Sequence, residues 1–162
     1  MKITRLSLEN DGHRAALCSL LDEYSRSPEG GGHALAPQVL QALPARLATC
    51  PTYIGLLAWQ GRTPAGLLNA FWSLSTFTAR PLVNIHDIIV SASFRRQGVG
   101  RALITQIADI ARELDCCKLT LEVLSGNLGA LALYRSCGFE HYVLDPAMGE
   151  ARFMQCWLGD PA

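Results

Sequence analysis

The chain has 162 residues, of which 49% are hydrophobic and 17% are charged, and its formal net charge at pH 7 is zero. This size and make-up suit a single globular domain, residues 1–162, with a buried core of its own. The balanced charge argues against a nucleic-acid partner, and the lack of an apolar run of about 18 residues argues against a membrane partner.

The N-terminus and the cysteines indicate the cellular compartment. The first eleven residues, MKITRLSLEND, contain no apolar stretch of the signal-peptide type, so we expect a cytoplasmic protein. The six cysteines show neither Cys-x-x-Cys spacing nor a framework of bridges. We therefore expect reduced, mostly buried thiols and no metal site.

The N-terminal third predicts one strand and two helices. Residues 2–8 alternate enough for a strand, and Asp11 is a plausible cap for a helix that runs to about Tyr24. Residues 25–36 break all periodicity and contain three consecutive glycines, which predicts a mobile loop. A second helix is expected over residues 37–49, with Pro in its first turn.

The middle of the chain predicts an antiparallel hairpin and a third strand. Two apolar segments, residues 53–59 and 64–76, are separated by a turn that contains Gly61. Residues 83–90 are rich in β-branched side chains and read as the next antiparallel strand.

A basic, glycine-containing turn follows that strand and opens a helix. Leucine and isoleucine recur from Leu103 to Leu114 at helical spacing. The start of a helix leaves backbone N–H groups unpaired and carries partial positive charge. A turn without bulky side chains at this place can therefore bind a phosphate group. The plainer alternative is that the glycines serve tight packing. The turn consists of Arg95, Arg96, Gln97, Gly98, Val99, Gly100 and Arg101.

The C-terminal third predicts a parallel strand, a helix and two further strands. Residues 118–123 alternate and return through a strand–helix–strand crossover, so they should pair parallel to residues 83–90. A helix over the segment 127–139 is followed by strands at 141–144 and 151–158 around a turn at 145–149. Together, the predicted elements indicate an α/β fold in which helices flank a mixed sheet.

Two of these segments resemble the motifs of the GCN5-related N-acetyltransferases, the GNAT family. The stretch from Ile85 to Arg101 is similar to the family's acetyl-CoA motif, in which a strand is followed by [Arg/Gln]-x-x-Gly-x-Gly/Ala and a helix. The second motif, Asn-x-x-Ala-x-x-x-Tyr with a nearby Gly-Phe, resembles Asn127, Ala130, Tyr134, Gly138 and Phe139. The resemblance is strong over residues 83–140, and in the N-terminal half it rests on the order of elements.

The resemblance implies a GNAT-like fold, a mostly antiparallel sheet with a splayed parallel strand pair, and acetyl-CoA as co-substrate without a metal. Pantetheine would lie along the backbone of the strand, and the amides of the basic turn would hold the pyrophosphate. The implied cofactor-binding residues are Ile88, Ile89, Val90, Arg95, Arg96, Gln97, Gly98, Val99, Gly100, Arg101, Asn127, Ala130 and Tyr134.

Tyr134 is the candidate general acid. A phenol with a pKa of about 10 stays protonated at neutral pH and can donate to a thiolate whose pKa is about 8.5. Helical spacing alone favours a packing role, because Ala130, Tyr134 and Cys137 share one face. The resemblance favours the catalytic role.

Three polar residues interrupt the apolar central strands and are candidates for removing the proton of the acceptor amine: His86, Asp87 and Glu122. His86 and Asp87 are neighbours, so they point to opposite faces unless a bulge intervenes. The hexapeptide IHDIIV also resembles the strand of diamine and spermidine/spermine acetyltransferases, in which Leu-Glu-Asp precedes the apolar residues. On that match His86 replaces a carboxylate and Asp87 matches the Asp. The plainer alternative is that His86 is a core residue with its hydrogen bonds satisfied. As the base, His86 is the first candidate, with Glu122 or Asp87 acting through water behind it.

The family places the acceptor pocket between the N-terminal helices and the sheet. Here this would involve Glu23, Tyr24 and Glu29 with the glycine loop, together with Trp72 and Phe77 from the hairpin region. Exposed acids could attract a cationic amine, although most are simply solvated.

The sequence therefore predicts an enzyme that transfers the acetyl group of acetyl-CoA to a primary amine of a small molecule, by direct attack in a ternary complex. The alternatives are acetylation of a protein or peptide amine and a CoA-binding regulatory module without turnover. A dinucleotide-binding oxidoreductase is disfavoured, because Leu103 occupies the place of the third glycine. An acyl-enzyme on Cys137 is the less favoured route. Many members of the family are dimers, so a homodimer is a further expectation.

Overall fold

The computed structural model describes residues 1–159. The chain forms two compact units, Met1–Leu121 and a second unit that begins at Glu122. Among the residues described, no helix combines the length and the apolar character needed to cross a membrane.

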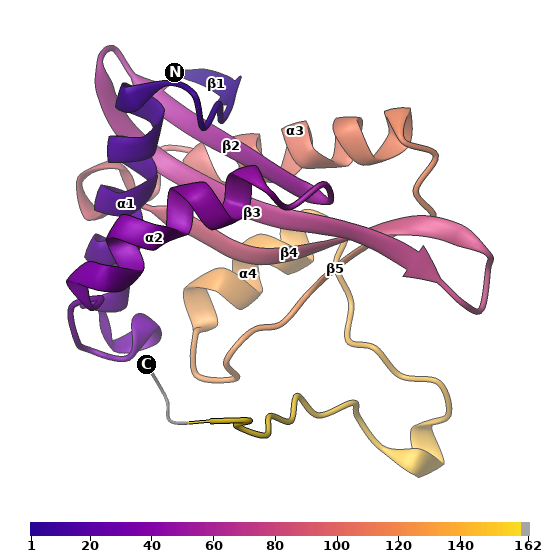
Figure 1. The fold of residues 1–162 in the computed structure, drawn as a ribbon. Coiled ribbons are helices and arrows are strands. Elements are labelled where there is room, and N and C mark those ends of the chain that lie inside the picture. The colour runs from indigo at the N-terminus through magenta and orange to yellow at the C-terminus, as the bar shows by residue number, and fades with distance from the viewer. Residues whose placement is uncertain (160–162) are drawn as a thin grey trace. The chain divides into compact units, whose positions relative to one another are not determined.

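The first unit is a five-stranded sheet with helices on both faces (Figure 1). The strands lie in the order β1-β2-β3-β4-β5, and β4 and β5 are the parallel pair while the other neighbours are antiparallel. The predicted α/β architecture is confirmed, including the crossover through α3. In chain order the elements are β1 (Lys2–Arg5), α1 (Asp11–Ser25), α2 (Pro37–Ala48), β2 (Tyr53–Gln60), β3 (Thr63–Ser75), β4 (Arg80–Val90), α3 (Val99–Glu113) and β5 (Leu119–Leu121).

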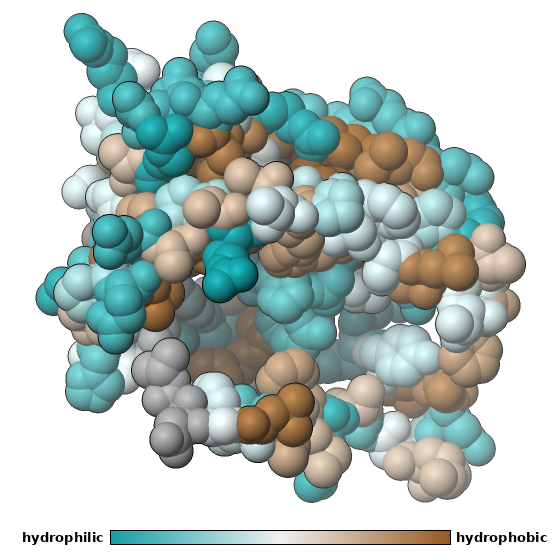
Figure 2. All heavy atoms as spheres, in the orientation of Figure 1, coloured by the Kyte–Doolittle hydropathy of each residue, from teal (hydrophilic) through white to brown (hydrophobic). Residues whose placement is uncertain are grey.

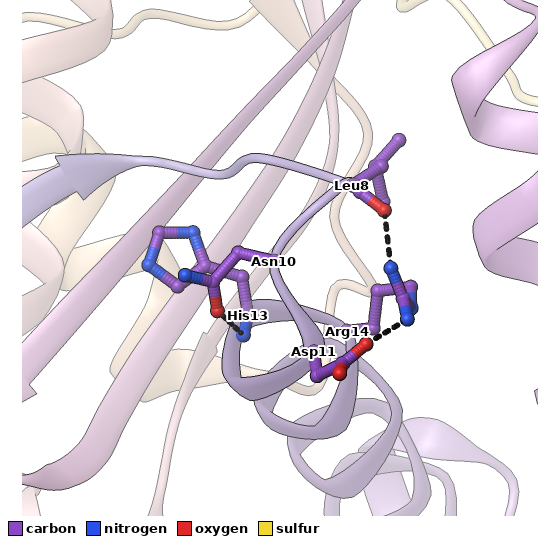
Figure 3. Close-up of polar contacts among 5 residues, drawn as sticks. All are labelled: Leu8, Asn10, Asp11, His13 and Arg14. Carbon is purple, nitrogen blue, oxygen red and sulfur yellow. Dashed lines mark hydrogen bonds and ion pairs between the residues drawn. The ribbon is translucent and has the colours of Figure 1, made fainter.

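Helix α1 begins one residue earlier than the predicted cap implies. Asn10 has extended backbone angles, and its Oδ1 accepts a hydrogen bond from the backbone N–H of His13 at 3.0 Å. Asp11 is the first helical residue and pairs with Arg14, which also donates to the carbonyl of Leu8 at 2.8 Å (Figure 3). Asn10 is therefore the cap, and Asp11 places its negative charge at the positive end of the helix.

The core against α1 forms on one face of the sheet. Leu57, Leu67 and Ile89, from three neighbouring strands, pack against apolar residues of α1, namely Ala16, Leu17 and Leu20. Burying these side chains contributes about 1.5–3 kcal/mol for each large one. The residues that alternate with Leu67 along β3 share its face, which places Asn69 and Phe71 on the α1 side.

Helix α3 packs on the opposite face, and Gly66 allows its close approach. A Cβ atom at Gly66 would lie 2.9 Å from Cγ1 of Val99 and 3.2 Å from Cδ1 of Leu103. Val99 is the first residue of α3. The missing side chain on β3 therefore sets how near the start of α3 comes to the sheet.

The structure shortens two predicted strands and orders the glycine loop locally. β1 ends at Arg5 and β5 spans three residues, because the ladder with β4 covers three residue pairs. The segment predicted as a mobile loop contains a 3₁₀ turn, Pro28–Gly30, and its Leu35 N–H donates to Asp22 Oδ1 at 3.1 Å.

The second unit contains α4 (Leu128–Ser136) and a 3₁₀ turn (Pro146–Met148) within the predicted turn. The predicted strands at 141–144 and 151–158 are wrong. Alternating apolar residues supply a side-chain pattern, but a strand also needs a neighbouring backbone to pair with. Hydrophobic side chains of this segment, among them Phe153, Met154 and Trp157, remain exposed; Figure 2 shows the hydropathy of the surface.

The six cysteines are thiols rather than disulfides, as predicted. Five are half-buried and Cys156 is exposed, so the expectation that most would be buried is wrong.

Candidate active site

Strand β4 presents a backbone edge beyond its short pairing with β5. The parallel ladder joins Val83, Asn84 and Ile85 of β4 to the three residues of β5. Residues 87–90 continue to pair with β3 on the other side, and no strand among residues 1–159 pairs with their second edge. This edge includes the backbone of Ile88, Ile89 and Val90. Peptide groups along such an edge can hydrogen-bond to an extended, amide-containing ligand.

The basic turn joins this strand to α3 in a strained conformation. After a 3₁₀ turn, Ala92–Phe94, Arg96 and Gly98 both have positive φ, 62° and 82°. Gly98 is the cap residue of α3, and its helix start carries no side-chain cap. Arg95, Arg96, Gln97 and Gly98 are exposed, whereas Val99 and Gly100 are buried. A helix start without a side-chain cap and the exposed arginines before it together favour an anion at this place.

Glu23 contributes to the turn rather than to a loop. It belongs to α1, and its Oε1 accepts a hydrogen bond of 2.8 Å from the N–H of Ala92. A carboxylate that accepts from the start of a 3₁₀ turn fixes that turn to α1. The expectation that Glu23 lies in a loop is therefore wrong: it is a helix residue that holds the β4–α3 connection.

A β-bulge places His86 and Asp87 on the same face of the sheet. Asn69 pairs with Asp87 and Ala70 pairs with Ile85, so His86 is the extra residue on β4. The His86 ring meets the edge of Phe71 with ring centroids 5.0 Å apart, and Asp87 bonds to Asn69. Since Asn69 and Phe71 share the α1 face, both candidates point there.

A hydrogen-bonded chain of side chains crosses three strands and ends at Asp87. The Tyr53 hydroxyl donates to Asn69 Oδ1 at 2.8 Å, and Asn69 Nδ2 donates to Asp87 Oδ2 at 2.9 Å. Burial, and secondarily the charge of Asp87, raise the pKa of Tyr53 far above its usual value. The sequence analysis missed Tyr53, Asn69 and Phe71. The available signal was Asn69, a polar residue in the middle of the apolar β3.

Tyr24 and Glu29, both expected at the acceptor pocket, contact each other. The Tyr24 hydroxyl donates to the backbone carbonyl of Glu29 at 3.2 Å. Burial raises the pKa of Tyr24, and the carboxylates of Asp87 and Glu29 raise it further. Hydrogen bonding by its own backbone N–H is the main cause that lowers the pKa of Glu29.

Trp72 and Phe77 do not lie with the candidate residues on the α1 face of the sheet. Trp72 follows Phe71 on β3 and pairs with Val83, so it points to the opposite face of the sheet. Phe77 is 93% exposed in the turn after β3. The aromatic ring on the α1 face of this part of β3 is that of Phe71, which contacts Tyr53 and His86.

In the second unit, the motif around Tyr134 forms the two ends of α4. Asn127 Oδ1 caps the helix by accepting from the N–H of Ala130 at 3.1 Å. At the other end Gly138 has a φ of 89°, and the N–H of Phe139 donates to the carbonyl of Tyr134 at 3.0 Å. With the bond from Gly138 N–H to Arg135, this is a Schellman motif. The spacing of the motif thus has a structural cause.

Tyr134 is held firmly at its place in α4. Its side chain is buried, and its ring lies 5.8 Å from that of Phe139, between centroids. The ring contact joins the residues that the Schellman motif brings together. Glu122, predicted to lie within the last central strand, follows the end of β5 and is exposed.

Solved structures share this fold. A crystal structure described as a probable acetyltransferase superposes with a TM-score of 0.82, covering 99% of this chain and 100% of that one at 21% identity. At this level of identity the likeness establishes the fold alone.

Curated relatives match part of the chain. The thialysine N-epsilon-acetyltransferase of Caenorhabditis elegans is 34% identical over 80 residues, which is 49% of each chain. The streptothricin acetyltransferase of Streptomyces lavendulae is 37% identical over 83 residues, 51% of this chain and 44% of that protein. The chain spans about half the length of the curated relatives it matches.

The family profile covers more of the chain than these relatives do. The profile of the acetyltransferase (GNAT) family matches residues 14–139, from the first turns of α1 to the residue that closes α4. Both motifs that carried the resemblance lie within this range. The chain therefore belongs to the GNAT family of acetyltransferases.

Proposed function

We propose that this protein is an acetyl-CoA-dependent N-acetyltransferase that acetylates a primary amine of a small molecule by direct attack in a ternary complex. The observation that carries the proposal is the open edge of β4, which leads through the basic turn into the uncapped start of α3. Thialysine and streptothricin, named in the relatives, are small molecules and support this acceptor class.

We also propose that residues 1–162 act as one catalytic domain in the cytoplasm. The family match crosses the boundary between the two units at Leu121, which supports a joint role for them. Association into a homodimer stays a prediction, and sedimentation measurements would test it.

The residues proposed to bind acetyl-CoA suit its parts. The backbone of Ile88–Val90 offers peptide groups to the amides of pantetheine, while the amides of residues 96–101, with their arginines, offer positive charge to the pyrophosphate. The family resemblance adds Asn127, Ala130 and Tyr134. In the structure the Asn127 side chain caps α4, so we assign it to fixing the start of that helix.

The chemistry requires two protons to leave the nitrogen, one before it attacks and one as the amide forms, and one proton to reach the departing sulfur. The acceptor R–NH₃⁺ loses a proton to His86, or through water to Asp87 or Glu122, and this proton then passes to solvent. The amine nitrogen attacks the carbonyl carbon, a C–N bond forms and the C–S bond breaks. The thiolate takes a proton from the Tyr134 phenol, which is restored by the proton that the nitrogen sheds on becoming an amide. The products are R–NH–acetyl, CoA–SH and H⁺.

The decisive experiment combines binding with an acceptor screen. Calorimetry should detect association with acetyl-CoA, and thiol release should appear with at least one amine among polyamines, aminoglycosides, amino acids and peptides. Binding without thiol release across the panel would favour the regulatory module. Turnover with peptides alone would favour the protein acetyltransferase.

Replacing Gly98 by Ala should weaken acetyl-CoA binding about tenfold. A non-glycine residue at a φ of 82° costs about 1–2 kcal/mol, and the turn escapes this cost by shifting the amides at the start of α3. Calorimetry measures the affinity. Gly61→Ala is the matched control, because Gly61 also has positive φ, 62°, but lies in the β2–β3 turn outside the proposed site. Equal affinities in both variants would contradict the role of the turn.

A further inference from the structure

We propose that Tyr53 and Asn69 are positioning residues that hold Asp87, through their hydrogen-bonded chain, as the carboxylate that binds the ammonium group of the acceptor. The inference rests on the proposed function and deepens it. It names the acceptor class, a cationic amine, and separates the task of Asp87 from that of His86.

The donor and acceptor roles in the hydrogen-bonded chain follow from the chemistry of its three side chains. A carboxylate accepts hydrogen bonds, so the amide NH₂ of Asn69 must face Asp87 Oδ2, 2.9 Å away. The Asn69 carbonyl oxygen then faces Tyr53, whose hydroxyl must be the donor at 2.8 Å. Every bond in the hydrogen-bonded chain thus directs a donor toward Asp87, which fixes the orientation of its carboxylate.

The surroundings enforce this arrangement. Asn69 is 4% exposed, so its amide cannot exchange these partners for bulk water. Burial raises the pKa of Tyr53, which keeps the phenol protonated and therefore a donor throughout the neutral range. A buried, fully engaged amide is costly to reorient, because its partners would be left without hydrogen bonds.

Gly55 leaves the space that the Tyr53 side chain needs to join the hydrogen-bonded chain. Gly55 is the β2 partner of Asn69, and a Cβ atom there would lie 2.4 Å from Tyr53 Oη and 2.9 Å from its Cζ. The Tyr53 ring therefore lies across the backbone of Gly55 to reach Asn69. A side chain at this position would displace the phenol from the chain.

His86 has a different environment on the same face. It is exposed and meets Phe71 edge-on, whereas Asp87 is half-buried and oriented by Asn69. Asp87 also directly precedes the open edge of β4 proposed for pantetheine. A fixed carboxylate at this place suits binding of a cation beside the thioester, and the exposed imidazole of His86 suits proton removal.

Two variants break the hydrogen-bonded chain, and one matched variant leaves it intact. Tyr53→Phe removes the first donor, and Asn69→Leu removes the bond to Asp87. Thr4→Val is the control, because it removes the acceptor of the Trp59 Nε1 hydrogen bond of 3.0 Å between β1 and β2. With a cationic amine, KM for the amine should rise about 3–10-fold in Tyr53→Phe and about 10–100-fold in Asn69→Leu. KM for acetyl-CoA should change less than twofold in all three.

Two further readouts separate positioning from a structural role. An acceptor that is already neutral at pH 7, such as a hydrazide or a fluorinated ethylamine, should show nearly wild-type KM in both chain variants. The double variant Tyr53→Phe/Asn69→Leu should lose little more than Asn69→Leu alone, because both substitutions act through one chain.

The outcomes distinguish the two proposals. Equal losses with cationic and neutral acceptors, or losses matched by Thr4→Val, would overturn the positioning role while wild-type turnover upheld the acetyltransferase. If Asn69→Leu does not fold, an unchanged amine KM in Tyr53→Phe overturns the inference by itself. A wild-type protein that turns over no amine would overturn both.

Discussion

Replacing Tyr134 by Phe is expected to lower turnover about ten- to a thousandfold and to leave acetyl-CoA affinity nearly intact. The substitution removes the hydroxyl that we propose protonates the departing thiolate. It preserves the ring, which packs against Phe139, and the backbone bonds that close α4. The fold of the second unit should therefore survive. Steady-state thiol release and calorimetry measure the two quantities separately.

Tyr142→Phe is the control for the Tyr134 variant. Tyr142 lies in the same unit and is 55% exposed, so loss of its hydroxyl should leave turnover unchanged. Unchanged turnover in Tyr134→Phe would remove this phenol from the mechanism. A parallel fall of turnover and acetyl-CoA affinity would indicate a binding role instead.

Replacing Gly66 by Ala is expected to reduce the free energy of unfolding by about 1–3 kcal/mol and to weaken acetyl-CoA binding. The added Cβ would lie 2.8 Å from the carbonyl oxygen of Ile89 and 2.9 Å from Cγ1 of Val99. The carbonyl belongs to the paired strand β4 and cannot move aside easily, whereas Val99 is the first residue of α3, so we expect the start of α3 to shift away from the sheet. This shift moves the amides proposed to hold the pyrophosphate. Denaturant unfolding and calorimetry measure the two effects.

Gly129→Ala provides the comparison for stability. Gly129 lies in α4, and a Cβ there meets only Asn127 Oδ1, at 4.0 Å. Helix propensity alone should make this variant neutral or slightly more stable. If Gly66→Ala unfolds at the same denaturant concentration as the wild type, close packing between β3 and α3 does not set the position of the helix start.

The proposed general acid, Tyr134, and the proposed acceptor-binding carboxylate, Asp87, are oriented by different kinds of contact. Tyr134 is oriented by contacts within eight residues of sequence, since Asn127 caps its helix and Phe139 packs on its ring. Asp87 is oriented by residues from β2 and β3, at sequence separations of 34 and 18 residues from Tyr53 and Asn69. Local motifs therefore identify the first group, and only the assembled sheet identifies the second.

The sequence by itself determined the elements that local patterns specify. The helical spacing after Gly98 and the apolar runs of the β2–β3 hairpin predicted elements that the structure confirms within one or two residues. Glycine turns and helix caps depend on residues that are close in the chain, so their signals are contained in short windows. The motifs that indicated the family lie in such windows.

Only the tertiary structure decided which polar residues share a face and which strands find a partner. A bulge reverses the alternation of β4, so His86 and Asp87 point the same way although their spacing predicts opposite faces. Asn69 and Tyr53 join Asp87 because three strands pair in one register, and residues 151–158 stay unpaired despite their apolar pattern. Strand pairing depends on the backbone of a distant segment, and a window of sequence does not contain that information.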